Sequence, residues 1–103
     1  MAIATVNIGS LIERNPDIRG GRPILSGTGV TVRRIVGWYQ LGLTPEEMRD
    51  RIGHPNLTLA HLYAALAYYH ANRDEIEADI ASEAADATRF EQQWLQMRSQ
   101  QAS

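Results

Sequence analysis

The chain has 103 residues, of which 44% are hydrophobic and 21% charged, so it suits one small globular domain and is not expected to be disordered throughout. It contains no cysteine, which excludes a disulfide scaffold, thiolate metal ligands and a cysteine nucleophile. No stretch approaches the roughly 20 apolar residues that span a bilayer, and the N-terminus lacks the features of a signal peptide. We therefore expect a cytoplasmic protein without membrane contact.

The net charge of −2 is unevenly distributed along the chain. Residues 1–73 carry eight arginines and five acids, a net charge of +3, whereas residues 74–103 carry two arginines and seven acids, a net charge of −5. Every basic residue is arginine, which suits bidentate contacts to phosphate or carboxylate. The asymmetry suggests a nucleic-acid-binding face and a separate acidic segment, and two ordinary solvated surfaces would give the same pattern.

Residues 1–32 have the composition of short strands and turns. Residues 23–25 and 30–32 are β-prone and flank a Ser-Gly-Thr-Gly turn at 26–29, which predicts a small hairpin. A two-stranded hairpin is marginally stable alone, so it must pack on helices or pair with another chain.

Helical periodicity begins near Val32, and Gly42 is expected to end this first helix. Thr44, Pro45 and Glu47 predict a second helix that starts with a capping box. That helix is expected to end at Ile52, with Gly53 as its C-terminal cap, and Thr58 can cap a third helix. This layout is typical of a helix-turn-helix.

Ten apolar residues after Thr58 fall on the a and d positions of one heptad frame: Leu59, Leu62, Leu66, Tyr69, Ile76, Ile80, Ala87, Phe90, Trp94 and Met97. One continuous helix of about 40 residues would be roughly 60 Å long. Residues 72–75 can form another capping box, so a break there is favoured. We expect a helix-turn-helix domain at residues 1–81 and an amphipathic C-terminal helix at residues 82–103. Its stripe of Phe90, Trp94 and Met97 is predicted to bind a partner.

No catalytic or metal-binding pattern stands out. His61 and His70 lie nine residues apart, the chain has no HExxH motif, and the acidic run at 74–79 is typical of a solvated helix face. We therefore expect no metal, no cofactor and no enzymatic activity.

Several motifs in order resemble a small bacterial family, domain of unknown function 433. They are Asn15-Pro16-Asp17-Ile18, Gly20-Gly21-Arg22-Pro23-Ile24, Gly27-Thr28, Val30-Thr31-Val32, Gly42-Leu43-Thr44-Pro45-Glu46-Glu47, His54-Pro55-Asn56-Leu57-Thr58 and Ala64-Ala65-Leu66-Ala67-Tyr68-Tyr69. The resemblance implies a mainly helical, homeodomain-like or winged helix-turn-helix fold. It also implies an antitoxin that neutralises a PIN-like nuclease toxin and binds DNA to autoregulate its operon. The family commonly has Arg directly after the Gly-Thr pair, where this chain has Gly29.

In a helix-turn-helix, the N-terminal residues of the second helix lie nearest the bases. The heptad frame turns its leucines inward and leaves five residues outward: Thr58, Ala60, His61, Ala64 and Ala65. Thr58 and His61 are then the predicted base contacts. The predicted phosphate contacts are Arg33, Arg34, Arg49 and Arg51.

The expected partners are a PIN-like toxin protein, operator DNA and a second copy of the chain in a homodimer. Arg49 and Arg51 can instead pair with neighbouring acids on their own helix. The alternative function is accordingly a protein-interaction module that does not bind DNA.

Overall fold

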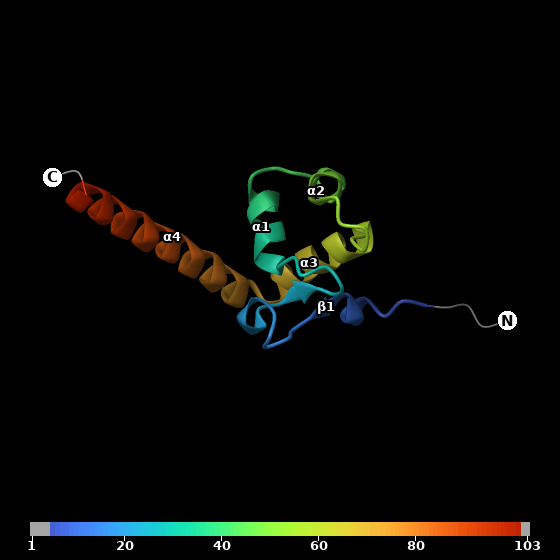
Figure 1. Ribbon diagram of the computed structural model, residues 1–103. Coiled ribbons are helices and arrows are strands. Elements are labelled where there is room, and N and C mark those ends of the chain that lie inside the picture. The colour runs from blue at the N-terminus through green and yellow to red at the C-terminus, as the bar shows by residue number, and fades with distance from the viewer. Residues whose placement is uncertain (1–4, 102–103) are drawn as a thin grey trace.

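The structure is a computed structural model that describes residues 5–101. The protein is mainly helical, with a small antiparallel sheet near the N-terminus, as the sequence predicts (Figure 1). The described residues form four α-helices: α1 Val32–Gln40, α2 Pro45–Ile52, α3 Leu59–Ala71 and α4 Arg73–Gln101. They also form two strands and two 3-10 turns: β1 Ile12–Glu13, β2 Ile24–Leu25, and the turns Ile8–Leu11 and Arg19–Gly21.

The small sheet pairs β2 with β1, with Ile12 opposite Leu25 in an antiparallel register. The hairpin predicted around residues 26–29 is present only as a single bridge between Ile24 and Thr31. The Leu25 N–H donates to the Val30 carbonyl oxygen at 2.8 Å beside that bridge. A two-residue strand such as β1 is too short to show alternation, so the sequence carries no signal for it.

The ends of α2 follow from the local sequence. Thr44 Oγ1 accepts a hydrogen bond from the Glu47 N–H at 3.2 Å, and Glu47 Oε1 accepts one from the Thr44 N–H at 3.1 Å. Gly53 ends the helix with φ 63°, a conformation that glycine adopts without steric cost. The predicted capping box and C-terminal cap are both confirmed.

A single apolar core joins the loop after β2 to all four helices. Its buried members come from β2, the loops and all four α-helices: Leu25, Val30, Val32, Ile35, Val36, Met48, Leu57, Leu62, Ala65, Tyr69 and Ile76. Since α3 packs against α1, α2, α4 and the sheet, it is the central helix of the body. Burial of this side-chain area is the main stabilising contribution to the fold.

The predicted break between the third and fourth helices is confirmed. Asn72 has non-helical φ and ψ angles of −138° and 47°, and its N–H donates to the Tyr68 carbonyl oxygen at 2.9 Å. After the break, α4 runs for 29 residues, about 43 Å, and projects away from the body (Figure 1). Within residues 5–101, no helix combines the length and the apolar character needed to cross a membrane.

Candidate functional site

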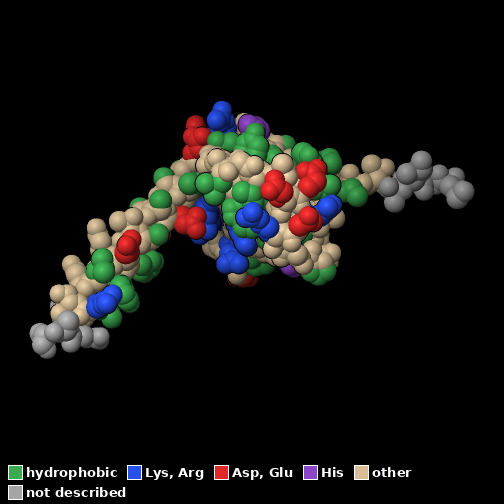
Figure 2. All heavy atoms as spheres, turned by 90° about the horizontal axis from the view of Figure 1, so that it is seen from above, with side chains coloured by type: hydrophobic (Ala, Val, Ile, Leu, Met, Phe, Trp, Pro, Cys, Tyr) green, Lys and Arg blue, Asp and Glu red, His purple; other side chains and the backbone are tan. Residues whose placement is uncertain are grey.

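The projecting part of α4 carries the aromatic stripe, defined as Phe90, Trp94 and Met97. Spacings of four and three residues put all three side chains on one helix face. Their exposed fractions are 62%, 54% and 58%. From residue 81 to residue 99 every residue except Asp86 is exposed. Hydrophobic side chains can be followed along this part of the helix in Figure 2. The stripe therefore extends past the globular body, as predicted.

The first turns of α4 are instead held to the body by ion pairs. Asp79 Oδ1 lies 2.6 Å from Arg22 Nε and 3.4 Å from Arg33 Nη1. Arg33 Nε lies 3.0 Å from Glu83 Oε2 as an ion pair, without the alignment of a hydrogen bond. Only 18% of the Arg33 side chain is exposed. This arginine, predicted as a phosphate contact, is thus engaged by two acids of its own chain.

The other predicted phosphate contacts are exposed and lie on two helices. Arg34 projects from α1, and its guanidinium carbon lies 4.9 Å from the centroid of the Trp38 ring. Arg49 and Arg51 project from α2, where Arg49 Nε lies 3.6 Å from Asp50 Oδ1. Thr58, a predicted base contact, is also exposed, and it caps α3 through Oγ1. The pairing of Arg49 with an acid of its own helix is therefore present, and DNA contact by these residues stays a prediction.

The predicted outward orientation of His61, Ala64 and Ala65 is wrong. All three are buried, with exposed fractions of 8%, 7% and 0%. His61 Nδ1 accepts a hydrogen bond from the Thr58 N–H at 3.2 Å, so its buried ring completes a capping box and does not point outward. The heptad frame fails here because α3 is covered on more than one side, whereas an a/d stripe assumes a single covered face. The exposed residues of α3 are Ala60, Tyr63, Ala67, His70 and Ala71.

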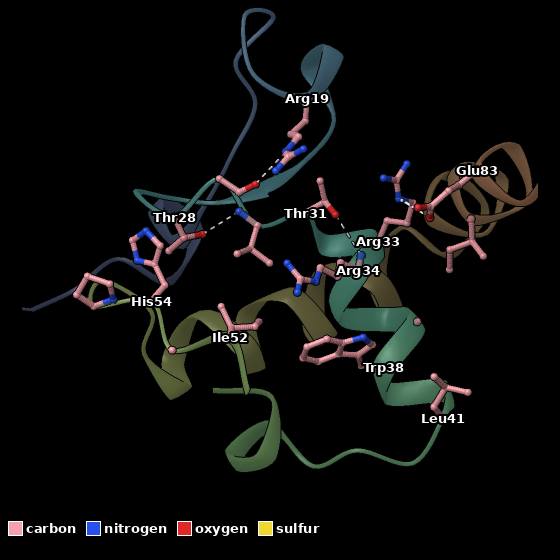
Figure 3. Close-up of a pocket in the computed structure, with 16 residues that line it drawn as sticks. Arg19, Thr28, Thr31, Arg33, Arg34, Trp38, Leu41, Ile52, His54 and Glu83 are labelled. Atoms are coloured by element: carbon pink, nitrogen blue, oxygen red, sulfur yellow. Dashed lines mark hydrogen bonds and ion pairs between the residues drawn. The ribbon is translucent and has the colours of Figure 1, made fainter. Parts of the chain in front are cut away.

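An open hollow of about 880 Å³ lies where three segments meet. Residues 28–31, helix α1 and residues 52–55 form its walls, and the α4 residues Ile80 and Glu83 close one side. Figure 3 shows Arg34 reaching into the hollow from α1, near Trp38, while Arg19 enters from the opposite side. The hollow thus combines arginines with an apolar floor.

Hydrogen bonds shift the pKa values of a few surface groups. Bonds to Tyr68 and Glu75 raise the pKa of the Arg14 guanidinium, and a bond to Asp79 raises the pKa of Arg22. Bonds from the backbone and hydroxyl of Thr44 lower the pKa of Glu47. Each shift stabilises a charged form that fastens one element to another or caps a helix.

Residues 12–69 match the family described as "Protein of unknown function (DUF433)". The match covers more than half of the chain. The chain belongs to the DUF433 family. A crystal structure of a DUF433 member protein from Anabaena variabilis is similar, with a TM-score of 0.62 and 31% sequence identity over 69% of this chain and 68% of that chain. No curated protein matches the chain.

The DUF433 match ends at residue 69, before α4 begins. It includes the sheet, the hollow's loop and turn, and nearly all of α3, but not the aromatic stripe. Sequence reasoning missed two residues of this DUF433 chain. Leu95 is 50% exposed beside the stripe, and Arg19 lines the hollow. No group of three His, Asp or Glu side chains that could hold a metal ion is found in the described part of the chain.

Proposed function

We propose that this protein is an antitoxin-like adaptor of the cytoplasm whose α4 helix binds and neutralises a PIN-like nuclease toxin. The observation that carries the proposal is the aromatic stripe, which is exposed on a helix that leaves the body. Monomeric proteins rarely keep large apolar side chains together in solvent without a binding function.

The stripe has the properties of a helix that docks into a groove. Fully burying each of its three side chains would contribute roughly 1.5–3 kcal/mol. The charges around the stripe are mixed. Glu83 and Asp86 pair with arginines of the same chain, and the guanidinium groups of Arg89 and Arg98 lie over the rings of Phe90 and Trp94. The aromatic anchors therefore carry the proposal, and the charge of the rim does not.

DNA binding by the body, with autoregulation of the operon, is the second candidate function. Helices α2 and α3 pack as a helix-turn-helix pair, and Arg34, Arg49 and Arg51 are exposed near it. A homodimer would present two such units to paired half-sites of operator DNA. The alternative is a protein-interaction module without DNA binding, favoured by the burial of His61 and the pairing of Arg33.

Truncation after Ile80 tests the division of labour between body and α4. We expect the shortened protein to fold and to keep any DNA binding, because the residues removed are almost all exposed. It should no longer protect cells that express the proposed PIN-like nuclease toxin. Continued protection by the shortened protein would contradict a role for the stripe.

Point variants separate the stripe from helix length. Phe90→Ala with Trp94→Ala should abolish protection, whereas Gln92→Ala with Gln93→Ala, on the same turns, should not. Sedimentation of both double variants shows whether the stripe instead joins two copies of the chain. Conversion of a dimer to a monomer only by the aromatic double variant would assign the stripe to self-association.

A further inference from the structure

Most arginines of this chain are neutralised by the chain itself. Six of the ten have a carboxylate oxygen within 4.0 Å: Arg14, Arg22, Arg33, Arg49, Arg73 and Arg89. Among the described residues, no carboxylate lies within that distance of the other four: Arg19, Arg34, Arg51 and Arg98. Two of these four, Arg19 and Arg34, line the same hollow. Positive charge without an internal partner is therefore concentrated there.

The hollow is held in shape by contacts between its walls. Asn56 Nδ2 donates to the Gly27 carbonyl oxygen at 3.2 Å, which joins the turn after α2 to the loop after β2. Arg19 Nε donates to the Gly29 carbonyl oxygen at 3.3 Å, which fixes the guanidinium at the edge of the same loop (Figure 3). A ligand that binds here meets donors already in position, so little ordering of side chains opposes binding.

Arg19 occupies a backbone conformation that is uncommon for residues with a side chain. Its φ is 53°, and among the described residues it alone has a positive φ without being glycine. Glycine would occupy this position without strain, whereas arginine here places a guanidinium that donates to the Gly29 carbonyl oxygen. In this position the guanidinium reaches the hollow.

We propose that this hollow, and not the exposed face of α2, contacts the phosphodiester backbone of duplex DNA through Arg19 and Arg34. The inference rests on the DNA-binding part of the proposed function. Guanidinium groups match phosphate oxygens with two parallel hydrogen bonds. The hollow is open, as passage of a continuous backbone requires, whereas a small molecule is usually enclosed.

Fluorescence anisotropy with a labelled duplex of about 20 base pairs, titrated over a series of salt concentrations, tests the assignment. Each phosphate contact contributes about 0.9 to the slope of log affinity against log salt. Arg19→Gln with Arg34→Gln should therefore lower the slope by about 1.8 per protomer. At 0.1 M salt this change in slope makes the double variant bind the duplex about 60-fold more weakly than the natural protein. Arg98→Gln, which removes an equally unpaired charge far from the hollow, should change affinity less than twofold.

A second variant guards against loss of fold. Arg19→Gly removes the guanidinium and its hydrogen bond to the Gly29 carbonyl oxygen, but glycine suits a φ of 53°, so the unfolding temperature should stay close to that of the natural protein. Its DNA affinity should still fall, about eightfold at 0.1 M salt. Unchanged affinity in this folded variant would overturn the role of Arg19.

The paired variant Arg49→Gln with Arg51→Gln separates this inference from the function on which it rests. If it loses affinity while the Arg19 and Arg34 variants do not, DNA contacts lie on α2 and the hollow is excluded. If the natural protein binds no duplex at low salt, DNA binding itself fails, and the proposed capture of a toxin by α4 is unaffected.

Discussion

The two halves of α4 have the same apolar spacing and opposite environments. In the proximal half, residues 73–80, Ile76 is fully buried and Ile80 partly buried against the core. In the distal half, residues 81–101, Phe90 and Trp94 continue the same heptad frame yet are more than half exposed. One helix thus contains a segment that completes a core and a segment whose aromatic stripe is left exposed by the described part of the chain.

The difference shows what a heptad pattern determines and what it leaves open. Periodicity specifies which helix face is apolar, but not which chain covers that face. In the proximal half, α1 and α3 provide the cover, and the ion pairs of Glu75 and Asp79 fix the helix to the body. In the distal half, Glu83 still pairs with Arg33 of α1, but every described residue from 87 to 99 is exposed, the aromatic stripe included.

Substitution in the proximal half should have the largest effect on stability. Ile76→Ala removes a fully buried side chain from the core, and we expect it to lower the free energy of unfolding by about 2–5 kcal/mol. Urea unfolding followed by circular dichroism measures the change. Trp94→Ala on the distal half is the matched control and should shift stability by no more than about 0.5 kcal/mol. Equal losses in the two variants would mean that the distal half is covered in solution.

Removal of a charge from the proximal half should have an intermediate effect. Asp79→Asn leaves Arg33 with only Glu83 as a partner, although the Arg33 side chain is 18% exposed. We expect a loss of about 1–3 kcal/mol in the free energy of unfolding. Asp86→Asn on the distal half breaks an exposed pair with Arg89 and should cost less than about 0.5 kcal/mol. If Asp79→Asn left the free energy of unfolding unchanged, these ion pairs would not hold α4 to the body.

Features set by local chemistry are predictable from this sequence. The ends of α2 follow from Thr44, Glu47 and Gly53 because caps depend on residues a few positions apart. The break before α4 lies where a capping box is predicted, but Asn72 Nδ2 donates there to the Tyr68 carbonyl oxygen and Glu75 accepts from Tyr68 and Arg14. The projecting stripe is also predictable, since its apolar residues outnumber the places that a core of this size can bury.

Features set by long-range packing are not predictable in the same way. The burial of His61 depends on how many elements surround α3, and no local pattern contains that number. Arg33 and its acid partners lie 46 and 50 positions apart along the chain, so their pairing is invisible before the fold is known. The hollow at Arg19 likewise depends on three segments that only the fold brings together.

The smallest expected effect concerns α2, which packs mainly against α3 and α1, and it sharpens the comparison because it changes no residue of α4. Hydrogen bonds from Thr44 lower the pKa of Glu47 in the folded protein. A lowered folded-state pKa stabilises the protein above the unfolded pKa of the carboxyl group, and this contribution is lost as the pH falls through the folded value. Glu47→Gln keeps an acceptor for the Thr44 N–H, so the capping box persists without a titrating group. At pH 7 the variant should therefore be slightly less stable than the natural protein, and the difference should shrink as the pH falls through the folded-state pKa of Glu47. Thermal unfolding over a series of acidic pH values measures it, and a difference that grows toward low pH would contradict the assigned role of the carboxylate.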